Sequence, residues 1–155
     1  MKANNIHTGY LRKMYIVTDN PVRYHLSFDH GNGVCLNEYL GKNIALHFTL
    51  EISCVGCTRK ITKSFNQGYC YPCFKKLARC DSCIIKPELC HFAAGTCREP
   101  EWGLSHCMQP HIVYLSQTSN IKVGVTRRTN MPARWFDQGA TQALAIIATQ
   151  KRLHA

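Results

Sequence analysis

Nine of the ten cysteines in this sequence lie between Cys54 and Cys107, and this concentration constrains the fold more than any other feature. The first four form two C-x2-C pairs, Cys54 with Cys57 and Cys70 with Cys73. Twelve residues separate the pairs, which is the spacing of a zinc ribbon. Each pair forms a tight knuckle, and two knuckles supply four thiolates to one tetrahedral ion. The spacing therefore predicts a structural Zn²⁺ site.

Disulfide bonds are the alternative use of these cysteines. A C-x2-C pair makes a poor structural disulfide, and the N-terminus lacks the apolar core of a signal peptide. The longest apolar run, 143–148, is too short to cross a bilayer. We therefore expect a cytoplasmic protein without a membrane segment, in a compartment where clustered cysteines bind metal.

The second half of the cysteine region predicts another metal site with less certain ligands. Cys80 and Cys83 form a third knuckle, and we expect a second Zn²⁺ held by this pair and two later residues. The later candidates are Cys90, Cys97 and Cys107, ranked equally, with His91 and His106 behind them. An iron–sulfur cluster is an open alternative, because it also accepts four thiolates. A redox-active or catalytic cysteine is another, although no base is paired with one.

The chain is strongly basic. Nineteen Lys and Arg residues against nine Asp and Glu residues give a formal net charge of +10. Two zinc ions, each held by four thiolates, would lower this charge to roughly +6. A basic chain favours a polyanionic partner, DNA or RNA first, and a ribosomal surface or acidic lipid less strongly.

Basic and aromatic residues alternate between residues 52 and 79, where no acidic residue occurs. The residues expected to contact phosphates are Arg59, Lys60, Lys63, Lys75 and Lys76. The aromatic residues are Phe65, Tyr69, Tyr71 and Phe74. They suit either stacking on bases or the small core of the metal module, and the sequence leaves both open.

The pattern predicts an α+β protein in three regions. Residues 1–51 show a small apolar run at 14–17 and alternating runs at 22–28 and 44–52, which predict a small antiparallel sheet. The last run leads into the first knuckle, so we expect the sheet to be fused to a metal module at 52–109. His25, His30 and Cys35 in the first region are expected to be ordinary structural residues.

Residues 110–155 form the third region, in which cysteine no longer occurs. The runs 111–117 and 121–126 predict a hairpin with a turn at 118–120. A helix follows, with Asn130 as a plausible N-cap, Pro132 in the first turn and Gly139 at the end. The apolar run 143–148 predicts a strand covered on both faces.

The strand pair and helix, VYLSQ, IKVGVT and ARWFDQGA, resemble the GIY-YIG endonuclease superfamily. The longer run from Cys97 to Leu144 is similar to an uncharacterised bacterial family, domain of unknown function 2797, in which zinc-type cysteines precede a GIY-YIG-like part. The closer resemblance covers most of the chain from about Cys54 onward. It implies that 110–155 is a β-β-α-β unit of the GIY-YIG type.

The GIY-YIG resemblance also implies roles for individual residues. Tyr114 corresponds to the tyrosine that positions the nucleophilic water, and Gly124 to the glycine of the second motif. Lys122 stands where that motif has a tyrosine, which it cannot replace chemically. Arg134 corresponds to the helix arginine that contacts the scissile phosphate. Arg127 and Arg128 are nearby candidates for phosphate contact.

The resemblance further implies a glutamate that binds Mg²⁺ or Mn²⁺ on a later helix, and this chain has no Glu or Asp after Asp137. We therefore expect a C-terminal unit that is one element short and has little or no cleavage activity. A protein partner or a dimer would then cover the incomplete sheet.

Three functions fit these features. The first is a zinc-stabilised, nuclease-like protein that binds nucleic acid. The second is a non-enzymatic zinc-ribbon adaptor for RNA, DNA or a protein, with the nuclease-like sheet as scaffold. The third is a thiol redox or metal-handling protein, which leaves the basic charge unexplained. Fold alone does not decide among them.

Overall fold

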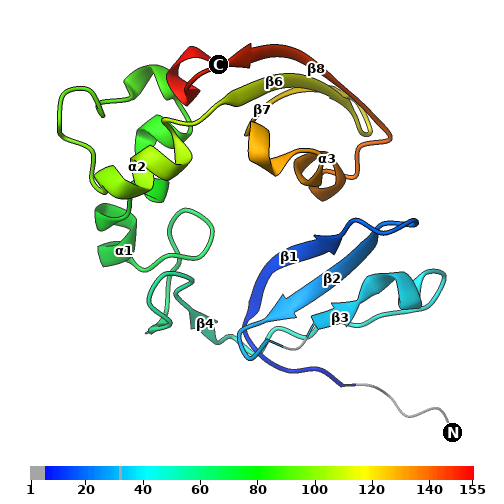
Figure 1. The fold of residues 1–155 in the computed structure, drawn as a ribbon. Helices are drawn as coiled ribbons and strands as arrows, with labels where there is room; N and C mark the ends of the chain where they lie inside the picture. The colour runs from blue at the N-terminus through cyan, green and yellow to red at the C-terminus, as the bar shows by residue number, and fades with distance from the viewer. Residues whose placement is uncertain (1–5, 32) are drawn as a thin grey trace, which may run out of the picture.

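The computed structural model describes residues 6–31 and 33–155, so residues 1–5 and Asn32, in the predicted N-terminal region, lie outside the described residues. The described chain is α+β, as predicted, with three small antiparallel sheets and short helices. Figure 1 shows an N-terminal sheet and a C-terminal sheet, with the cysteine-rich part beside them.

The N-terminal sheet contains β1 (Leu11–Val17), β2 (Arg23–Phe28) and β3 (Gly33–Cys35) in the order β1-β2-β3. Its antiparallel pairing confirms the first two predicted strands. Tyr15 stacks on His25 across β1 and β2, with ring centroids 4.7 Å apart. Such cross-strand aromatic pairs stabilise a sheet that has few strands.

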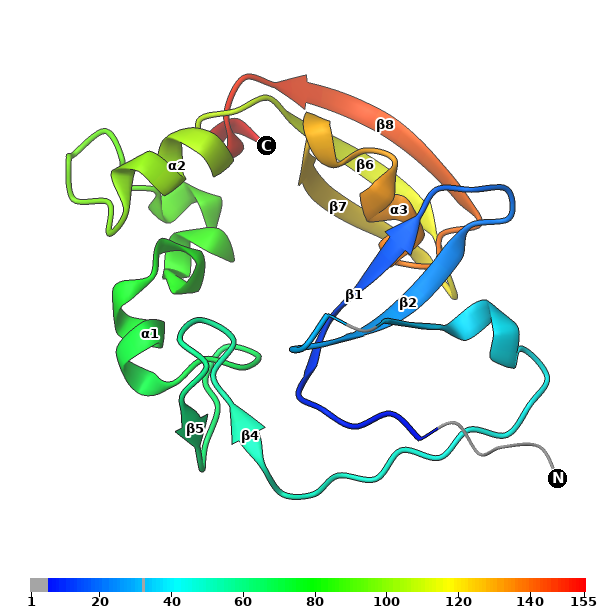
Figure 2. The same ribbon diagram turned by 60° about the horizontal axis from the view of Figure 1, so that its bottom comes forward.

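The predicted strand at 44–52 is wrong for most of its length. Residues 44–50 are irregular, and Leu46 and Leu50 are 82% and 81% exposed. Only β4 (Ile52–Ser53) pairs, with β5 (Lys60–Ile61). An alternating run becomes a strand only where a partner strand and an apolar layer are available, and among residues 6–31 and 33–155 no strand pairs with residues 44–50. Figure 2 shows it as a long connection between the N-terminal sheet and β4.

The cysteine-rich part contains α1 (Tyr71–Lys76), α2 (Pro100–His106) and 3₁₀ turns at Ala78–Cys80, Ser82–Ile84 and Pro87–Leu89. A proline stands in the first turn of both α-helices, where its missing N–H costs nothing. Polar contacts join the turns: the Ala78 N–H donates to Glu99 Oε2 at 2.7 Å. The buried apolar residues of this part are few and include several cysteines, so packing alone gives it little stability.

The C-terminal unit has the predicted order strand, strand, helix, strand. It comprises β6 (His111–Gln117), β7 (Ile121–Arg127), α3 (Ala133–Asp137) and β8 (Gln142–Thr149), with sheet order β7-β6-β8. Pro132 is the N-cap of α3, whereas Asn130 belongs to the preceding 3₁₀ turn, so the predicted N-cap is wrong. Gly139 ends the helical segment with φ of +63°, a conformation that favours glycine.

The two faces of this sheet differ. Ile112, Tyr114 and Ser116 of β6 are buried on the face toward α3, and Tyr114 packs edge-on against Trp135 of that helix at 6.1 Å. On the other face Val123 and Leu144 are 71% and 64% exposed. The prediction that 143–148 is covered on both faces is therefore wrong. β8 is an edge strand, and α3 covers one face only.

Gly124 allows the closest packing in this sheet. It lies directly opposite Tyr114, and a Cβ on Gly124 would stand 2.4 Å from Tyr114 Cζ. The Tyr114 ring therefore occupies the space that any other residue at 124 would need, which is a common reason for glycine inside a strand.

We predict that Gly124→Ala lowers the free energy of unfolding by about 1–3 kcal/mol, because the fully buried ring cannot move aside. Urea unfolding measures this. In a Tyr114→Leu background the same substitution should cost less, since the overlapping ring atoms are gone. An equal loss of unfolding free energy in both backgrounds would show that the close packing of Tyr114 on Gly124 does not cause the destabilisation.

Candidate functional site

The structure brings the first four predicted metal ligands together. The Sγ atoms of Cys54, Cys57, Cys70 and Cys73 all lie within 4.8 Å of one another, and those of Cys57 and Cys70 are 3.7 Å apart. An ion with Zn–S bonds of about 2.3 Å holds its sulfurs about 3.8 Å apart. All ten cysteines, which lie in the described residues, are free thiols. This cluster can therefore hold a metal ion such as zinc.

Backbone N–H groups donate hydrogen bonds to a sulfur of the cluster and so stabilise its thiolate form. The Cys70 N–H donates to Cys54 Sγ at 3.2 Å, and the Gly56 N–H donates to the same sulfur at 3.4 Å. Thr58, just after the first knuckle, has φ of +61°, which marks the tight turn at the end of that knuckle. Such outer contacts orient metal ligands and stabilise their ionised form.

The thiols of the cluster differ in acidity. Burial alone would raise the pKa of Cys54, but the N–H groups of Cys70 and Gly56 outweigh burial and lower the pKa to about 6. The pKa of Cys73 is raised to about 12, first by its hydrogen bond with the Cys70 thiol and then by burial. Without a cation the cluster thus carries a thiolate at Cys54 beside a protonated Cys73, and metal binding must displace protons.

We predict that the purified protein contains zinc at this cluster and that Cys73→Ser loses it. Cys35→Ser, at the end of β3, is the matched control and should retain it. Elemental analysis of the two variants measures the difference. Zinc that survives in Cys73→Ser at the level of the control would contradict the assignment.

We also predict that zinc affinity falls as the pH is lowered, because protons compete with the ion for the thiols. The fall should steepen below about 6, where Cys54 also becomes protonated in the metal-free protein. Chelator competition across a pH series measures this affinity. A flat profile would show that the thiols are not the ligands.

The second group of cysteines is arranged differently. Cys83, Cys90, Cys97 and Cys107 line one small cavity, together with Asp81, His91 and apolar side chains. Cys80, a predicted ligand, is buried in the Ala78–Cys80 turn and does not line that cavity. Ligand atoms of Asp81, Cys83 and His91 lie within 4.8 Å of one another, so these three can also hold a metal ion.

Sequence reasoning missed Asp81, although it stands inside the Cys80–Cys83 knuckle. Its carboxylate forms an ion pair with Arg98 Nε at 2.7 Å and lies 3.4 Å from His91 Nε2. Burial would raise the pKa of Asp81, but Arg98, the Ser82 N–H and His91 together lower it. The carboxylate therefore stabilises the fold above its ordinary pKa of about 4, and this stabilisation is lost as the pH falls through the lowered value.

We predict that Asp81→Asn lowers the free energy of unfolding by about 1–3 kcal/mol at neutral pH, because Arg98 loses a charged partner. Asp19→Asn is the control, since its pair with Arg23 is about half exposed and should contribute less than about 1 kcal/mol. Urea unfolding of the metal-saturated protein compares them. Equal losses of unfolding free energy in the two variants would contradict the expectation that the buried ion pair stabilises the fold more than the exposed one.

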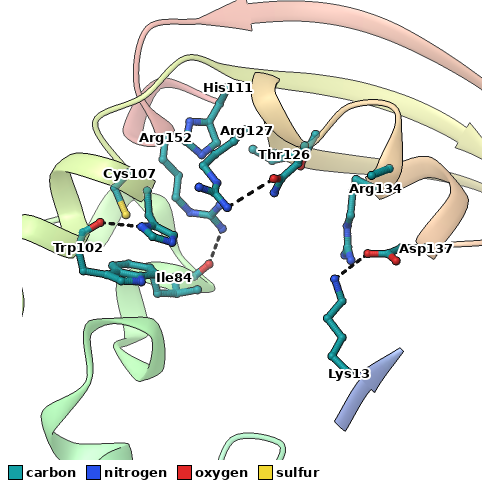
Figure 3. Close-up of a pocket in the computed structure, with 14 residues that line it drawn as sticks. Lys13, Ile84, Trp102, Cys107, His111, Thr126, Arg127, Arg134, Asp137 and Arg152 are labelled. Atoms are coloured by element: carbon teal, nitrogen blue, oxygen red, sulfur yellow. Dashed lines mark hydrogen bonds and ion pairs between the residues drawn. The ribbon is translucent and has the colours of Figure 1, made fainter. Parts of the chain in front are cut away.

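A basic cavity of about 500 Å³ lies between the C-terminal unit and the cysteine-rich part. Lys13 of β1, Arg127 of β7, Arg134 of α3 and Arg152 near the C-terminus line it, and Figure 3 shows their side chains around one space. Asp137 is the only acidic residue in the lining, and it pairs with Lys13 at 2.7 Å. The cavity thus has a surplus of positive charge.

Hydrogen bonds hold two of these arginines in place. Arg152 Nη2 donates to the Ile84 carbonyl at 2.5 Å, and the Arg152 N–H donates to the Cys107 carbonyl at 2.8 Å. Arg127 Nη1 donates to the Ser105 carbonyl at 3.4 Å. The guanidinium groups are therefore positioned before any ligand binds, which lowers the entropy lost on binding.

The two histidines in the lining are held neutral. Burial lowers the pKa of His111 first, and the charges of Arg152 and Arg127 add to this effect. His111 Nδ1 donates to the Gln109 carbonyl at 2.7 Å, which leaves Nε2 as an acceptor. Burial and then Arg127 likewise lower the pKa of His106, whose ring stacks on Trp102. The positive charge of the cavity thus comes from its lysine and arginines.

A second basic depression of about 580 Å³ lies on the metal module. Arg59, Lys60 and Lys63 line it with Phe65 and Tyr71. Phe65 packs against Phe74 at 5.7 Å, whereas the Tyr71 side chain is 56% exposed. Phe65 and Phe74 therefore contribute to the small core, which is one of the two uses that the sequence left open, and Tyr71 remains accessible.

The other predicted nucleic-acid contacts lie outside both depressions. Lys75 and Lys76 are exposed on α1, and Arg128 is exposed in the turn after β7. Lys60 is already paired with Glu51 at 3.0 Å. The structure also adds Lys13 and Arg152, which no motif marks in the sequence because they come from opposite ends of the chain.

The four predicted catalytic residues do not share one surface. Tyr114 is fully buried, and its hydroxyl donates to Gln138 Oε1 at 2.8 Å. Gly124 packs under the Tyr114 ring. Arg134 lines the basic cavity, whereas Lys122 is exposed opposite Ser116 and outside that lining.

Residues 41–155 match the sequence model of the family described as Protein of unknown function (DUF2797). The chain belongs to this family. The match confirms the predicted DUF2797 resemblance and covers the metal module and the C-terminal unit, while the N-terminal sheet precedes it. No match was found among curated proteins or solved structures. In the described residues of this DUF2797 member, none of the helices has the length and apolar character to cross a membrane.

Proposed function

We propose that this protein is a zinc-containing nucleic-acid-binding protein of the GIY-YIG nuclease-like type. It binds the phosphates of a nucleic acid without cleaving the nucleic-acid strand. The observation that carries the proposal is the basic cavity. Arg127, Arg134 and Arg152 converge there, and the single carboxylate of the lining is already paired with Lys13. A phosphodiester is the anion that several converging guanidinium groups suit best.

The depression on the metal module supports the same ligand class. Lys63 and Arg59 offer phosphate contacts, and the exposed Tyr71 ring offers a flat surface for a base. The Lys63 ammonium also lies 5.4 Å from the Phe65 ring centroid, so this aromatic residue helps to place a cation in the depression. Basic and aromatic side chains together are typical of surfaces that bind single strands.

Two observations favour binding over hydrolysis. The GIY-YIG resemblance implies that Tyr114 positions the attacking water, but its hydroxyl is buried and bonded to Gln138. Single-metal hydrolysis also needs a carboxylate to hold the ion, and Asp137, the acidic residue of the cavity lining, is neutralised by Lys13. If Mg²⁺ or Mn²⁺ has a role in this chain, cleavage assays with either ion will reveal it.

We predict that the protein binds labelled DNA or RNA with an affinity that falls steeply with salt. Arg134→Gln and Arg152→Gln should each weaken binding and lower the salt slope by about 0.7–0.9, because each removes one phosphate contact. Lys86→Gln makes the same charge change at an exposed position outside both depressions and should leave the slope unchanged. Fluorescence anisotropy across a salt series measures all four proteins.

The same titration on single-stranded, duplex and branched DNA and on RNA, with and without Mg²⁺ or Mn²⁺, tests cleavage. Retarded, intact strands are the expected result. Metal-dependent nicking that Arg134→Ala abolishes would instead make the protein a nuclease. Absence of binding at low salt would contradict both and favour an adaptor for a protein partner, for which the exposed β7–β8 face of the sheet is the available surface.

A further inference from the structure

The cavity lined by Cys83, Cys90, Cys97 and Cys107 is built like a metal centre but not like the first one. Its thiols come from four separate places: the Ser82–Ile84 turn, the residue after the next turn, the loop before α2, and the end of α2. The rest of the wall is formed by Ala78, Asp81, Ile84, His91, Phe92, Trp102 and Gly103.

The spacing of the sulfurs separates this site from a single-ion site. In the first cluster four thiols lie within 4.8 Å of one another. Among residues 6–31 and 33–155, no three thiols of the second set approach so closely; only Asp81, Cys83 and His91 do. A single tetrahedral ion needs sulfurs about 3.8 Å apart. In a four-iron, four-sulfide cluster each cysteine binds a different iron atom, so the cysteine sulfurs lie further apart than around a single ion.

Asp81 and His91 are better placed as neighbours of the centre than as ligands. The Asp81 carboxylate is held by Arg98 at 2.7 Å, and His91 Nδ1 is hydrogen-bonded to Thr96 Oγ1 at 2.8 Å. Groups with such partners orient and polarise a metal centre from outside its ligand set.

We infer that Cys83, Cys90, Cys97 and Cys107 hold an iron–sulfur cluster. Helix α2 shapes its wall, since a Cβ on Gly103 would stand 2.9 Å from the Phe92 ring and 3.3 Å from Cys97 Sγ. Arg127 and Arg152 line the basic cavity together with Cys107, so their positive charges would offset the negative charge of a cluster held by four thiolates. Cys107 lines the basic cavity as well, so the cluster would form part of the wall of the phosphate site.

The test is the metal content of the full-length protein purified without oxygen, or reconstituted with ferrous iron and sulfide. Iron and acid-labile sulfide in equal amounts, with the visible absorption of a thiolate-bound cluster and zinc at the first site, are the expected result. Serine substitution of each of the four cysteines should remove iron and sulfide and leave zinc. Retained zinc reports that each variant keeps its folded metal module.

Two controls sharpen the ligand assignment. Cys35→Ser, far along the chain in β3, and Cys80→Ser, next to the centre but outside its cavity, should both keep iron and sulfide. Two zinc ions per chain without iron, after reconstitution, would overturn the inference. Loss of iron in Cys80→Ser, with iron kept in one of the four variants, would overturn it too. None of these measurements involves nucleic acid, so the outcome is independent of the proposed function.

Discussion

The clustering of Cys54, Cys57, Cys70 and Cys73, which can hold one metal ion, is the constraint on which the middle of the molecule depends. The segment from β4 to α2 has short helices, two-residue strands and few buried apolar side chains, so hydrophobic burial cannot hold it together. A metal ion bound by four thiolates would replace that missing core and fix the two knuckles relative to each other. The second basic depression lies on this module, so an ion in the cluster would also fix the position of the basic side chains that line it.

Local sequence signals predicted a good part of the fold. The runs 111–117 and 121–126 correspond closely to β6 and β7, because alternation and a polar turn specify a hairpin without distant contacts. The run 44–52 shows the limit of such reasoning. Its alternation is as regular as that of a strand, yet no neighbouring strand accepts it, and Leu50 has φ of +65°. Whether a partner strand is present depends on the tertiary structure, which local periodicity does not reveal.

The candidate sites also differ in whether local sequence signals could predict them. The C-x2-C pairs could be found in the sequence because both knuckles are local and their spacing is characteristic. The basic cavity could not, because Lys13 and Arg152 reach it from the two ends of the chain through the fold. Asp81 was also missed, since its partner Arg98 lies on a different turn. The burial of Tyr114 likewise depends on Gly124 and Gln138, which a motif comparison treats separately.

The exposed connection at 44–50 has a consequence for how the basic cavity is maintained. Lys13, one wall of that cavity, belongs to the N-terminal sheet, which joins the rest of the chain through this unpaired stretch. The sheet is held to the C-terminal unit by side-chain contacts, including the Lys13–Asp137 pair and the hydrogen bond of 3.2 Å from the Tyr24 hydroxyl to the Phe136 carbonyl. The cavity therefore depends on side-chain contacts between the N-terminal sheet and the C-terminal unit. A protease that cuts the connection, or an anion that competes with Asp137 for Lys13, would weaken these contacts while leaving the strands of both parts intact.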